Sequence, residues 1–136
     1  MLLDILQNLH DKGYKTFPCT LDKRPTVKWK ENNTYNMEMY KETYAIICGE
    51  NNLCVLDLDI GCPLEIRDGI LKGLSSETLC VQTPSKGIHI YFKLKDEGYN
   101  QRIRWKKRNE AGELRVKNQY VIGYGSRAIS TKTNPP

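Results

Sequence analysis

Two aspartates separated by one leucine, in the segment NNLCVLDLDI (residues 51–60), are the first residues in this sequence that could do chemistry. So apolar a segment predicts a buried strand, and burying an unpaired carboxylate is costly. Side chains alternate along a strand, so Asp57 and Asp59 are expected on one face, opposite Leu56 and Leu58. Neighbouring carboxylates repel each other unless a cation lies between them, and divalent cations prefer carboxylate oxygens. The spacing therefore indicates a divalent-cation site.

Two further predicted strands carry polar residues in the same alternating manner. In GIHIYF, His89 and Tyr91 face away from the isoleucines, and in GELRV, Glu113 and Arg115 face away from the leucine and valine. If the three strands share a sheet, their polar faces converge on a triple carboxylate with a histidine and an arginine beside it. Three carboxylates suit a pair of Mg²⁺ or Mn²⁺ ions, which could activate a 3′-hydroxyl and stabilise a departing pyrophosphate.

Donors for the phosphates of a nucleotide lie close by in the sequence. The turn Ser85-Lys86-Gly87 precedes His89, and Arg115 follows Glu113. Each feature also has a structural interpretation: the aspartates as a solvated face, the histidine as a core residue, Glu-x-Arg as a cross-strand pair, and TPSKG as a simple tight turn. The order and placement of all of them together favour a functional site.

The elements that must position these residues follow from hydrophobic periodicity and turn residues. The turn-forming segment GENN, between two apolar strands, predicts a hairpin. The fold class expected is α+β, with a mostly antiparallel sheet and helices packed on one face. Helices are predicted at residues 2–12, 34–40 and 63–74, the first with Leu2, Leu3, Leu6 and Leu9 on one face, and strands at 14–19, 44–49, 53–60, 78–83, 88–95, 113–116 and 119–124.

Length and composition limit the class of protein. The 136 residues predict one domain over 1–136, with 127–136 expected to be a flexible tail or a truncated end, and 39% hydrophobic with 27% charged residues is ordinary for a globular chain. No apolar stretch reaches transmembrane length, and Asp4 interrupts the apolar start, which argues against a signal peptide. A cytoplasmic location and no membrane partner are expected. The five cysteines have no CxxC spacing, so reduced core cysteines are expected.

The ordered set of motifs resembles the catalytic domain of the archaeo-eukaryotic primase superfamily, in its bifunctional primase-polymerase (Prim-Pol) branch. VLDLDI resembles the D-x-D strand of that family, TPSKGIHIYF its T-x-S-G-G-x-H-like strand opening, and GELRVKNQYVIGYGS its later acidic strand. GYKTFPCTLDKRPTVKWKE is similar to its opening, a G-x-x-x-F-P strand followed by K-x-P and W. The chain departs from the pattern where Lys86 replaces the first glycine and where GYGS replaces the later prolines.

The resemblance implies an RRM-like primase core and a template-dependent nucleotidyltransferase, a DNA primase/polymerase acting in DNA replication. It implies that Asp57, Asp59 and Glu113 are catalytic and bind two Mg²⁺ or Mn²⁺ ions. The implied partners are a DNA template and primer, an NTP or dNTP substrate, and a helicase or other replication subunit. The residues that would bind the nucleotide are Ser85, Lys86, Gly87, His89 and Arg115.

Two basic segments could contact a polyanion, consistent with a formal charge of +5. An aromatic residue in the second could stack on a base. The predicted nucleic-acid contacts are Lys23, Arg24, Lys28, Lys30, Arg102, Arg104, Trp105, Lys106, Lys107 and Arg108.

Two other functions stay open at this point. One is a non-catalytic nucleic-acid-binding primase accessory subunit on the same fold. The other is a replication initiator or nuclease with a metal-bound histidine and Tyr91 or Tyr120 as nucleophile, although such nucleases use a pair of histidines on one strand and IHIYF offers one.

Overall fold

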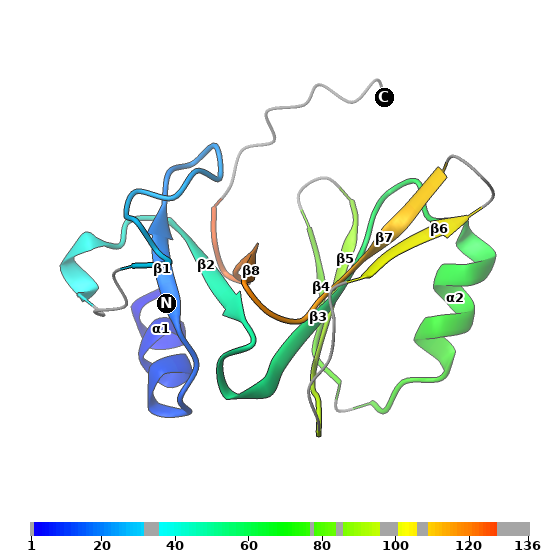
Figure 1. The fold of residues 1–136 in the computed structure, drawn as a ribbon, viewed down its shortest axis with the longest axis horizontal. Helices are drawn as coiled ribbons and strands as arrows, with labels where there is room; N and C mark the ends of the chain where they lie inside the picture. The colour runs from blue at the N-terminus through cyan, green and yellow to red at the C-terminus, as the bar shows by residue number, and fades with distance from the viewer. Residues whose placement is uncertain are drawn as a thin grey trace. The chain divides into compact units, whose positions relative to one another are not determined.

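The computed structural model describes residues 2–31, 36–76, 78–83, 86–95, 101–105 and 109–127, without the side chains of 101–105 and 109–111. The chain divides into two compact units. The first unit comprises Met1–Asn51 with Asn118–Pro136, and the second comprises Asn52–Lys117. The elements of each unit are labelled in Figure 1.

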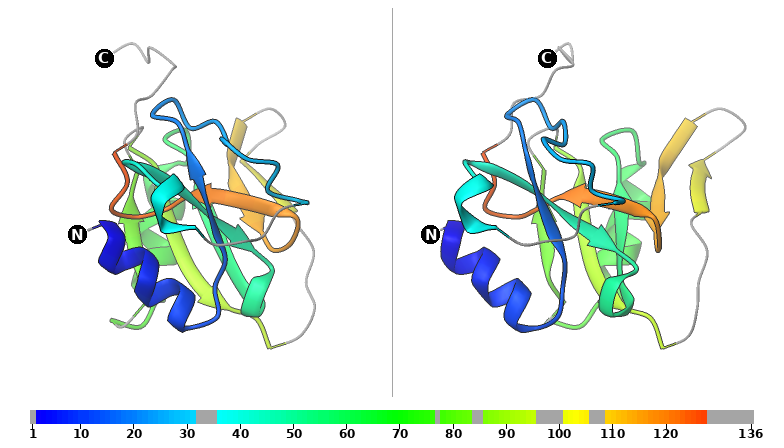
Figure 2. Two further views of the ribbon diagram at one scale, coloured as in Figure 1. Left: turned by 90° about the vertical axis from the view of Figure 1, so that its left-hand side faces the viewer. Right: turned by 60° about the vertical axis from the view of Figure 1, so that its left-hand side comes forward.

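The first unit is built on a three-stranded antiparallel sheet of order β1-β2-β8. Helix α1 lies alongside this sheet in both views of Figure 2, and the side chain of His10 is 2.9 Å from the hydroxyl of Thr16 on β1. Leu6 and Leu9 are buried, whereas Leu3 is 47% exposed, so the predicted apolar face of α1 is narrower than expected. The elements are α1 (Leu2–Asp11), β1 (Thr16–Cys19), η1 (Met37–Met39), β2 (Thr43–Cys48), η2 (Glu50–Asn52, shared with the second unit) and β8 (Gln119–Ile122).

Strand β1 contains a proline, a residue that has no N–H to donate to a neighbouring strand. Pro18 pairs with Tyr44 of β2 and is followed by one more strand residue, Cys19. The strand tolerates proline because β1 lies at the edge of the sheet, where the missing N–H need not break the ladder. The predicted helix at 34–40 is the short η1, capped by the side chain of Asn36, and Thr34 lies outside the described residues.

The second unit is built on a five-stranded sheet of order β4-β5-β3-β7-β6, in which every neighbouring pair is antiparallel. Sequence analysis predicted all of its elements except β6, which lies in the basic segment. The elements are β3 (Leu53–Leu58), α2 (Leu64–Lys72), β4 (Cys80–Gln82), β5 (Ile88–Lys93), β6 (Gln101–Trp105) and β7 (Asn109–Arg115).

Helix α2 covers the apolar face of the five-stranded sheet (Figure 1). Ile66 and Ile70 pack against a buried cluster that includes Leu58, Ile88 and Ile90. Burial of this apolar surface stabilises the helix against the sheet. Because strand side chains alternate, the residues between these positions lie on the other face of the sheet.

The α+β fold with antiparallel pairing is confirmed, but the expected hairpin around GENN is wrong. Strand β2 pairs with β1 and β8, whereas β3 pairs with β5 and β7 in the other sheet. The connection does turn sharply, with positive φ at Gly49, Asn51 and Asn52. Turn-forming residues predict that the chain changes direction, but they do not predict which strands pair, because pairing is decided by tertiary packing.

Candidate active site

The predicted polar faces of three strands meet at Asp57. In the β3–β5 register Asp57 is opposite His89, and in the β3–β7 register it is opposite Glu113. Directly opposite residues of an antiparallel pair lie on the same face of the sheet. The row continues outward to Val81 of β4 and, through the backbone, to Arg102 of β6. Antiparallel pairing therefore brings three polar residues from distant parts of the sequence together on the sheet face opposite α2.

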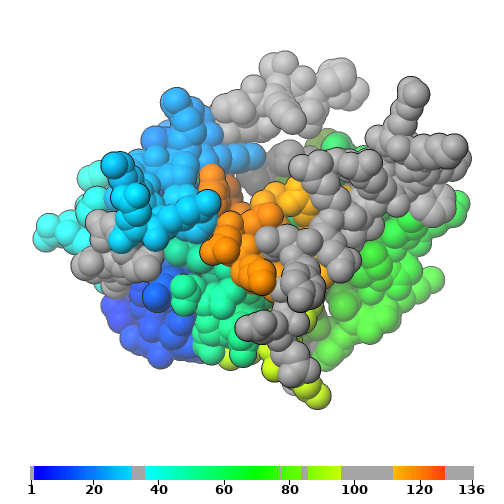
Figure 3. Space-filling view, in the orientation of Figure 1, coloured from blue at the N-terminus to red at the C-terminus, as the bar shows by residue number. Residues whose placement is uncertain are grey.

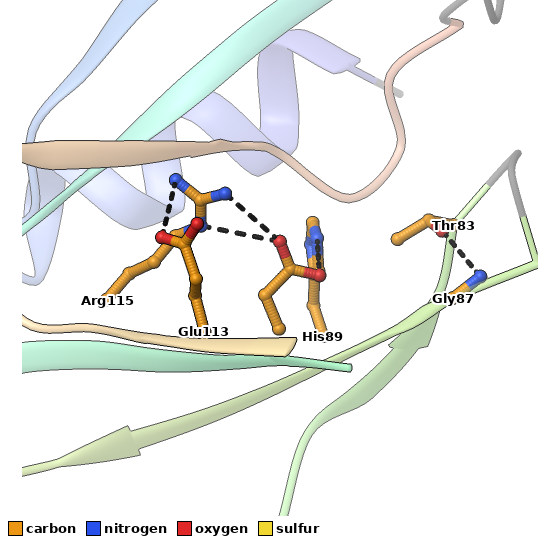
Figure 4. Close-up of polar contacts among 6 residues, drawn as sticks. Thr83, Gly87, His89, Glu113 and Arg115 are labelled. Atoms are coloured by element: carbon orange, nitrogen blue, oxygen red, sulfur yellow. Dashed lines mark hydrogen bonds and ion pairs between the residues drawn. The ribbon is translucent and has the colours of Figure 1, made fainter. Parts of the chain in front are cut away.

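The carboxylate of Asp57 contacts two basic side chains, those of His89 and Arg115, both of which are labelled in Figure 4. Its Oδ1 is 3.4 Å from Nε2 of His89, and its Oδ2 is 3.3 Å from both Nε and Nη2 of Arg115. The remaining guanidinium nitrogen, Nη1, is 3.9 Å from Oε2 of Glu113. Arg115 thus interacts with the carboxylates of both Asp57 and Glu113. Asp57 interacts with the side chains of both His89 and Arg115.

The protonation of Asp57 is controlled by opposing influences. Burial, the largest, raises the pKa of its carboxyl group, and the hydrogen bonds and charges of His89 and Arg115 lower it. The lowering prevails, so the pKa lies below the ordinary value of 3.8 and the group is ionised at neutral pH. Only 18% of the Asp57 side chain and 26% of the Arg115 side chain are exposed, so solvent screens this pair less than a surface salt bridge.

Asp59 does not occupy the strand position that sequence analysis gave it. Strand β3 ends at Leu58, and the carbonyl of Asp59 accepts a hydrogen bond of 2.9 Å from the N–H of Cys62. This turn redirects the chain toward Pro63 and α2, which ends the strand alternation before Asp59. Among the described residues, no three His, Cys, Asp or Glu side chains are arranged to hold a metal ion. The assignment of Asp57, Asp59 and Glu113 as metal ligands stays a prediction.

A tight turn between β4 and β5 lies next to the end of β3. The N–H of Gly87 donates to Oγ1 of Thr83 at 2.9 Å (Figure 4). The N–H of Lys86 donates to the Thr83 carbonyl at 2.9 Å. A Cβ at Gly87 would come 2.7 Å from the carbonyl oxygen of Leu58, so the close approach requires glycine. Thr83 begins the TPSKG motif but was not assigned a role, and its hydroxyl organises the turn. Ser85 lies outside the described residues.

His89 presents its two ring nitrogens to different surroundings. Nε2 faces Asp57, whereas Nδ1 is buried and has no hydrogen-bond partner in the described part of the chain. A buried polar nitrogen without a partner is energetically unfavourable, so a water or a ligand oxygen at Nδ1 would be stabilising.

A comparison with protein-family models gives one match over most of the chain. Residues 6–134 match the model described as bifunctional DNA primase/polymerase, N-terminal (Prim-Pol). The chain belongs to the Prim-Pol family. No curated protein sequence matches it significantly. The matched region of this Prim-Pol chain contains the cross-strand row of His89, Asp57 and Glu113 and the turn between β4 and β5. It also contains both compact units apart from the ends of the chain.

The first predicted basic segment of the Prim-Pol chain is the loop after β1, which lies in the first unit and on the surface in Figure 3. The positive charge of Arg24 is partly neutralised by Asp22, because Nη2 of Arg24 lies 2.7 Å from Oδ2 of Asp22. Lys28 and Lys30 are exposed, and Lys30 places Nζ 5.4 Å from the ring centroid of Trp29. Lys23 lies in the same loop, partly buried and with a positive φ of 69°.

Trp29 is a candidate DNA contact that the predicted set did not include. Its ring stacks on Phe17 with centroids 5.3 Å apart and meets Tyr120 edge-on at 5.2 Å. These contacts hold the ring against the buried cluster that includes Phe17. Its sequence neighbours Lys28 and Lys30 are exposed, and an aromatic residue in a basic loop is typical of single-strand binding surfaces. The alternation Lys28-Trp29-Lys30 in the sequence was the available signal.

The second predicted basic segment is only partly described. The backbones of Arg102, Arg104 and Trp105 belong to β6, and Lys106, Lys107 and Arg108 lie outside the described residues. Sequence analysis predicted no strand in this segment, whereas its first part belongs to β6, which pairs with β7. Its role in binding DNA stays a prediction.

Neither tyrosine of the nuclease hypothesis is presented as an exposed nucleophile. Tyr91 is 8% exposed, and Tyr120 packs edge-on against Phe17 with ring centroids 4.9 Å apart.

No helix in the described part of the chain is long and apolar enough to cross a membrane.

Proposed function

We propose that this Prim-Pol chain is a template-dependent nucleotidyltransferase that adds nucleotides to a primer during DNA replication by a two-metal mechanism. The observation that carries the proposal is the cross-strand row of His89, Asp57 and Glu113, with Arg115 between the two carboxylates. The family match over residues 6–134 supports the same chemistry.

The donor set of the row fits hard divalent cations. Asp57 and Glu113 supply carboxylates from neighbouring strands at one register, and Asp59 lies directly after the end of β3. Mg²⁺ and Mn²⁺ prefer such oxygen ligands, so these three residues would hold the ions. When bound, the ions would lower the pKa of the attacking 3′-hydroxyl and neutralise charge on the departing pyrophosphate.

The chain's own residues prepare the site for an anionic substrate. Asp57 is ionised at neutral pH, because burial does not raise its pKa above the ordinary value, so no proton has to leave before the carboxylate can act as a ligand. His89 and Arg115 can donate to phosphate oxygens, and exposed Lys86 adds a cation at the turn beside β5. In this proposal, the Lys86 side chain at the turn binds the triphosphate, while the carboxylates hold the metal ions.

The test is nucleotide addition to a primed DNA template, using labelled nucleotides with Mg²⁺ or Mn²⁺. Asp57→Ala should reduce addition by roughly 10²-fold or more, because a misplaced reacting group costs about that much. Asp68→Ala is the matched control, since Asp68 is an exposed aspartate on α2, which covers the other face of the sheet. Equal activity of the parent and the Asp57→Ala variant would contradict the proposal.

Two further variants separate metal binding from nucleotide binding. Glu113→Gln should resemble Asp57→Ala if Glu113 is a ligand. His89→Ala should weaken nucleotide binding and leave metal binding intact, because it removes a donor and no carboxylate. Calorimetric titration of each variant with Mn²⁺ and with nucleotide distinguishes the two patterns.

A non-catalytic accessory subunit is the second candidate. The observation that favours it is the engagement of Asp57 by His89 and Arg115, with no three-ligand metal group among the described residues. It predicts that the parent binds DNA but adds no nucleotide with either ion. Incorporation that requires Asp57 would exclude it.

A further inference from the structure

Arg115 forms the most extensive ionic interaction of the candidate site. Two of its nitrogens lie 3.3 Å from the same Asp57 oxygen, and the third lies 3.9 Å from Glu113. Without a cation here, two carboxylates would lie directly opposite each other on neighbouring strands, an arrangement that is destabilising. The guanidinium therefore supplies the positive charge that holds this pair together.

A divalent ion at the same carboxylates would compete with Arg115. Mg²⁺ binds oxygen ligands at about 2.0–2.1 Å with strict geometry, and at Oδ2 it would compete with the hydrogen bond from Nε and the ion pair with Nη2. The ion and the guanidinium would also repel each other, and water would screen this repulsion only partly, because the side chains of Arg115 and Asp57 are 26% and 18% exposed.

We propose that Arg115 is an exchangeable counter-cation: it holds Asp57 and Glu113 in the metal-free protein and must leave Asp57 when a divalent ion binds. This inference rests on the proposed metal site at these carboxylates. It gives Arg115 two successive partners, because a guanidinium released from Asp57 can pair with phosphate oxygens of an incoming nucleotide. The exchange makes Arg115 a positioning residue that lowers the affinity for the metal ion.

The direction of the effect separates this role from a merely structural one. If Arg115 only maintained the shape of the site, its removal would disorder the ligands and weaken metal binding. If it competes, its removal exposes the carboxylates and tightens metal binding, while the metal-free protein becomes less stable. The two readouts therefore move in opposite directions only under competition.

The experiment titrates the metal-free full chain with Mn²⁺, following free Mn²⁺ by electron paramagnetic resonance, and measures melting in EDTA and in Mn²⁺. Arg115→Ala should bind Mn²⁺ about tenfold more tightly, melt at a lower temperature in EDTA, and gain more from Mn²⁺ than the parent does. Arg115→Lys keeps the charge but not the forked donors, so its Mn²⁺ affinity and its melting temperature in EDTA should lie between those of the parent and Arg115→Ala.

Two additional variants secure the interpretation. Arg67→Ala removes an arginine from α2, which packs on the other face of the sheet, and should bind Mn²⁺ like the parent. Arg115→Gln, which keeps a hydrogen-bonding group, carries the test if Arg115→Ala does not fold, and it too should bind Mn²⁺ more tightly.

Unchanged or weaker Mn²⁺ binding by the folded Arg115→Ala or Arg115→Gln variant would overturn the exchange and leave the proposed nucleotidyltransferase standing. If the parent and every variant failed to bind Mn²⁺, both the exchange and the proposed metal site would be wrong. Nucleotide addition by the parent is measured separately, so the two failures are distinguishable.

Discussion

Gly112 of β7 lies so close to Asp57 of β3 that a Cβ at position 112 would come 2.0 Å from the Asp57 carbonyl oxygen. Gly112 is opposite Leu58 in the register and directly precedes Glu113. The close approach therefore sets β7 against β3 at the point where the two carboxylates meet.

Gly112→Ala should destabilise the protein by roughly 1–3 kcal/mol or more, because a methyl group there forces the backbones of β3 and β7 apart. Gly69→Ala is the control, since Gly69 lies within α2 with nothing within 4 Å of a Cβ. That change should be neutral or stabilising by up to about 1 kcal/mol, because alanine favours helix. Urea denaturation of both variants tests the difference, and equal stability would contradict the close approach.

Asp57 should make stability depend on acidic pH. Burial raises its pKa, and the hydrogen bonds and charges of His89 and Arg115 lower it by more, so the folded pKa lies below 3.8. The stabilisation is present above the unfolded value and is lost as pH falls through the folded pKa. The free energy of unfolding of the parent should approach that of Asp57→Asn from about pH 5 down to about pH 2. A constant difference over this range would show that the carboxylate is not stabilised in its ionised form.

His10 should make stability depend on pH in a higher range than Asp57 does. Burial lowers its pKa below 6.5, partly opposed by the charge of Asp11, so the folded protein disfavours the protonated ring. The stabilisation is complete above 6.5 and is lost as pH falls from there through the folded pKa. His10→Gln should therefore flatten the change in the free energy of unfolding between about pH 7.5 and pH 5. The same slope in both proteins would exclude this contribution.

The five cysteines should differ in reactivity toward a thiol reagent. Burial raises the pKa of Cys19 to about 12 and that of Cys54 to about 11, so both are thiols at pH 8. Cys80 is exposed, whereas the other four are buried. Native protein should release one equivalent rapidly with a chromogenic disulfide, and Cys80→Ser should abolish that phase. Rapid labelling of Cys80→Ser would mean that another cysteine is accessible.

Trp29 should report DNA binding through its fluorescence. In a Trp105→Phe background Trp29 is the remaining tryptophan, and stacking of a base should quench it. Trp29→Ala should weaken binding of single-stranded DNA by about 1–3 kcal/mol, while Trp29→Phe should retain most of it. Lys28→Ala with Lys30→Ala should reduce the dependence of affinity on salt. Tight, salt-independent binding, or binding without quenching, would remove this loop from the DNA-binding surface.

Much of the local structure follows from the sequence. The apolar alternation of β3 and β5, the turn at TPSKG and the helix after Pro63 were predicted because their signals lie within a few neighbouring residues. Alternation also predicted which side chains share a face, and this was enough to expect Asp57, His89 and Glu113 on one surface.

Strand pairing was decided only by the tertiary structure. GENN predicted a hairpin between β2 and β3, yet these strands lie in different sheets. Strand β6 was missed because its alternation of arginine with apolar residues also suits a solvated basic loop. Pairing partners depend on which faces can be buried together, and no single segment contains that information.

The sequence by itself determined which chemical types are available to the candidate site, namely two aspartates, a glutamate, a histidine and an arginine, because these are identities of residues in order along the chain. Only the tertiary structure decided which of them touch. Asp59 falls beyond the end of β3, and Arg115, one strand away from Asp57, supplies its countercharge. The physical reason is that ionic contacts depend on distances of a few ångströms across neighbouring strands, and these distances are set by register, twist and the close approach at Gly112.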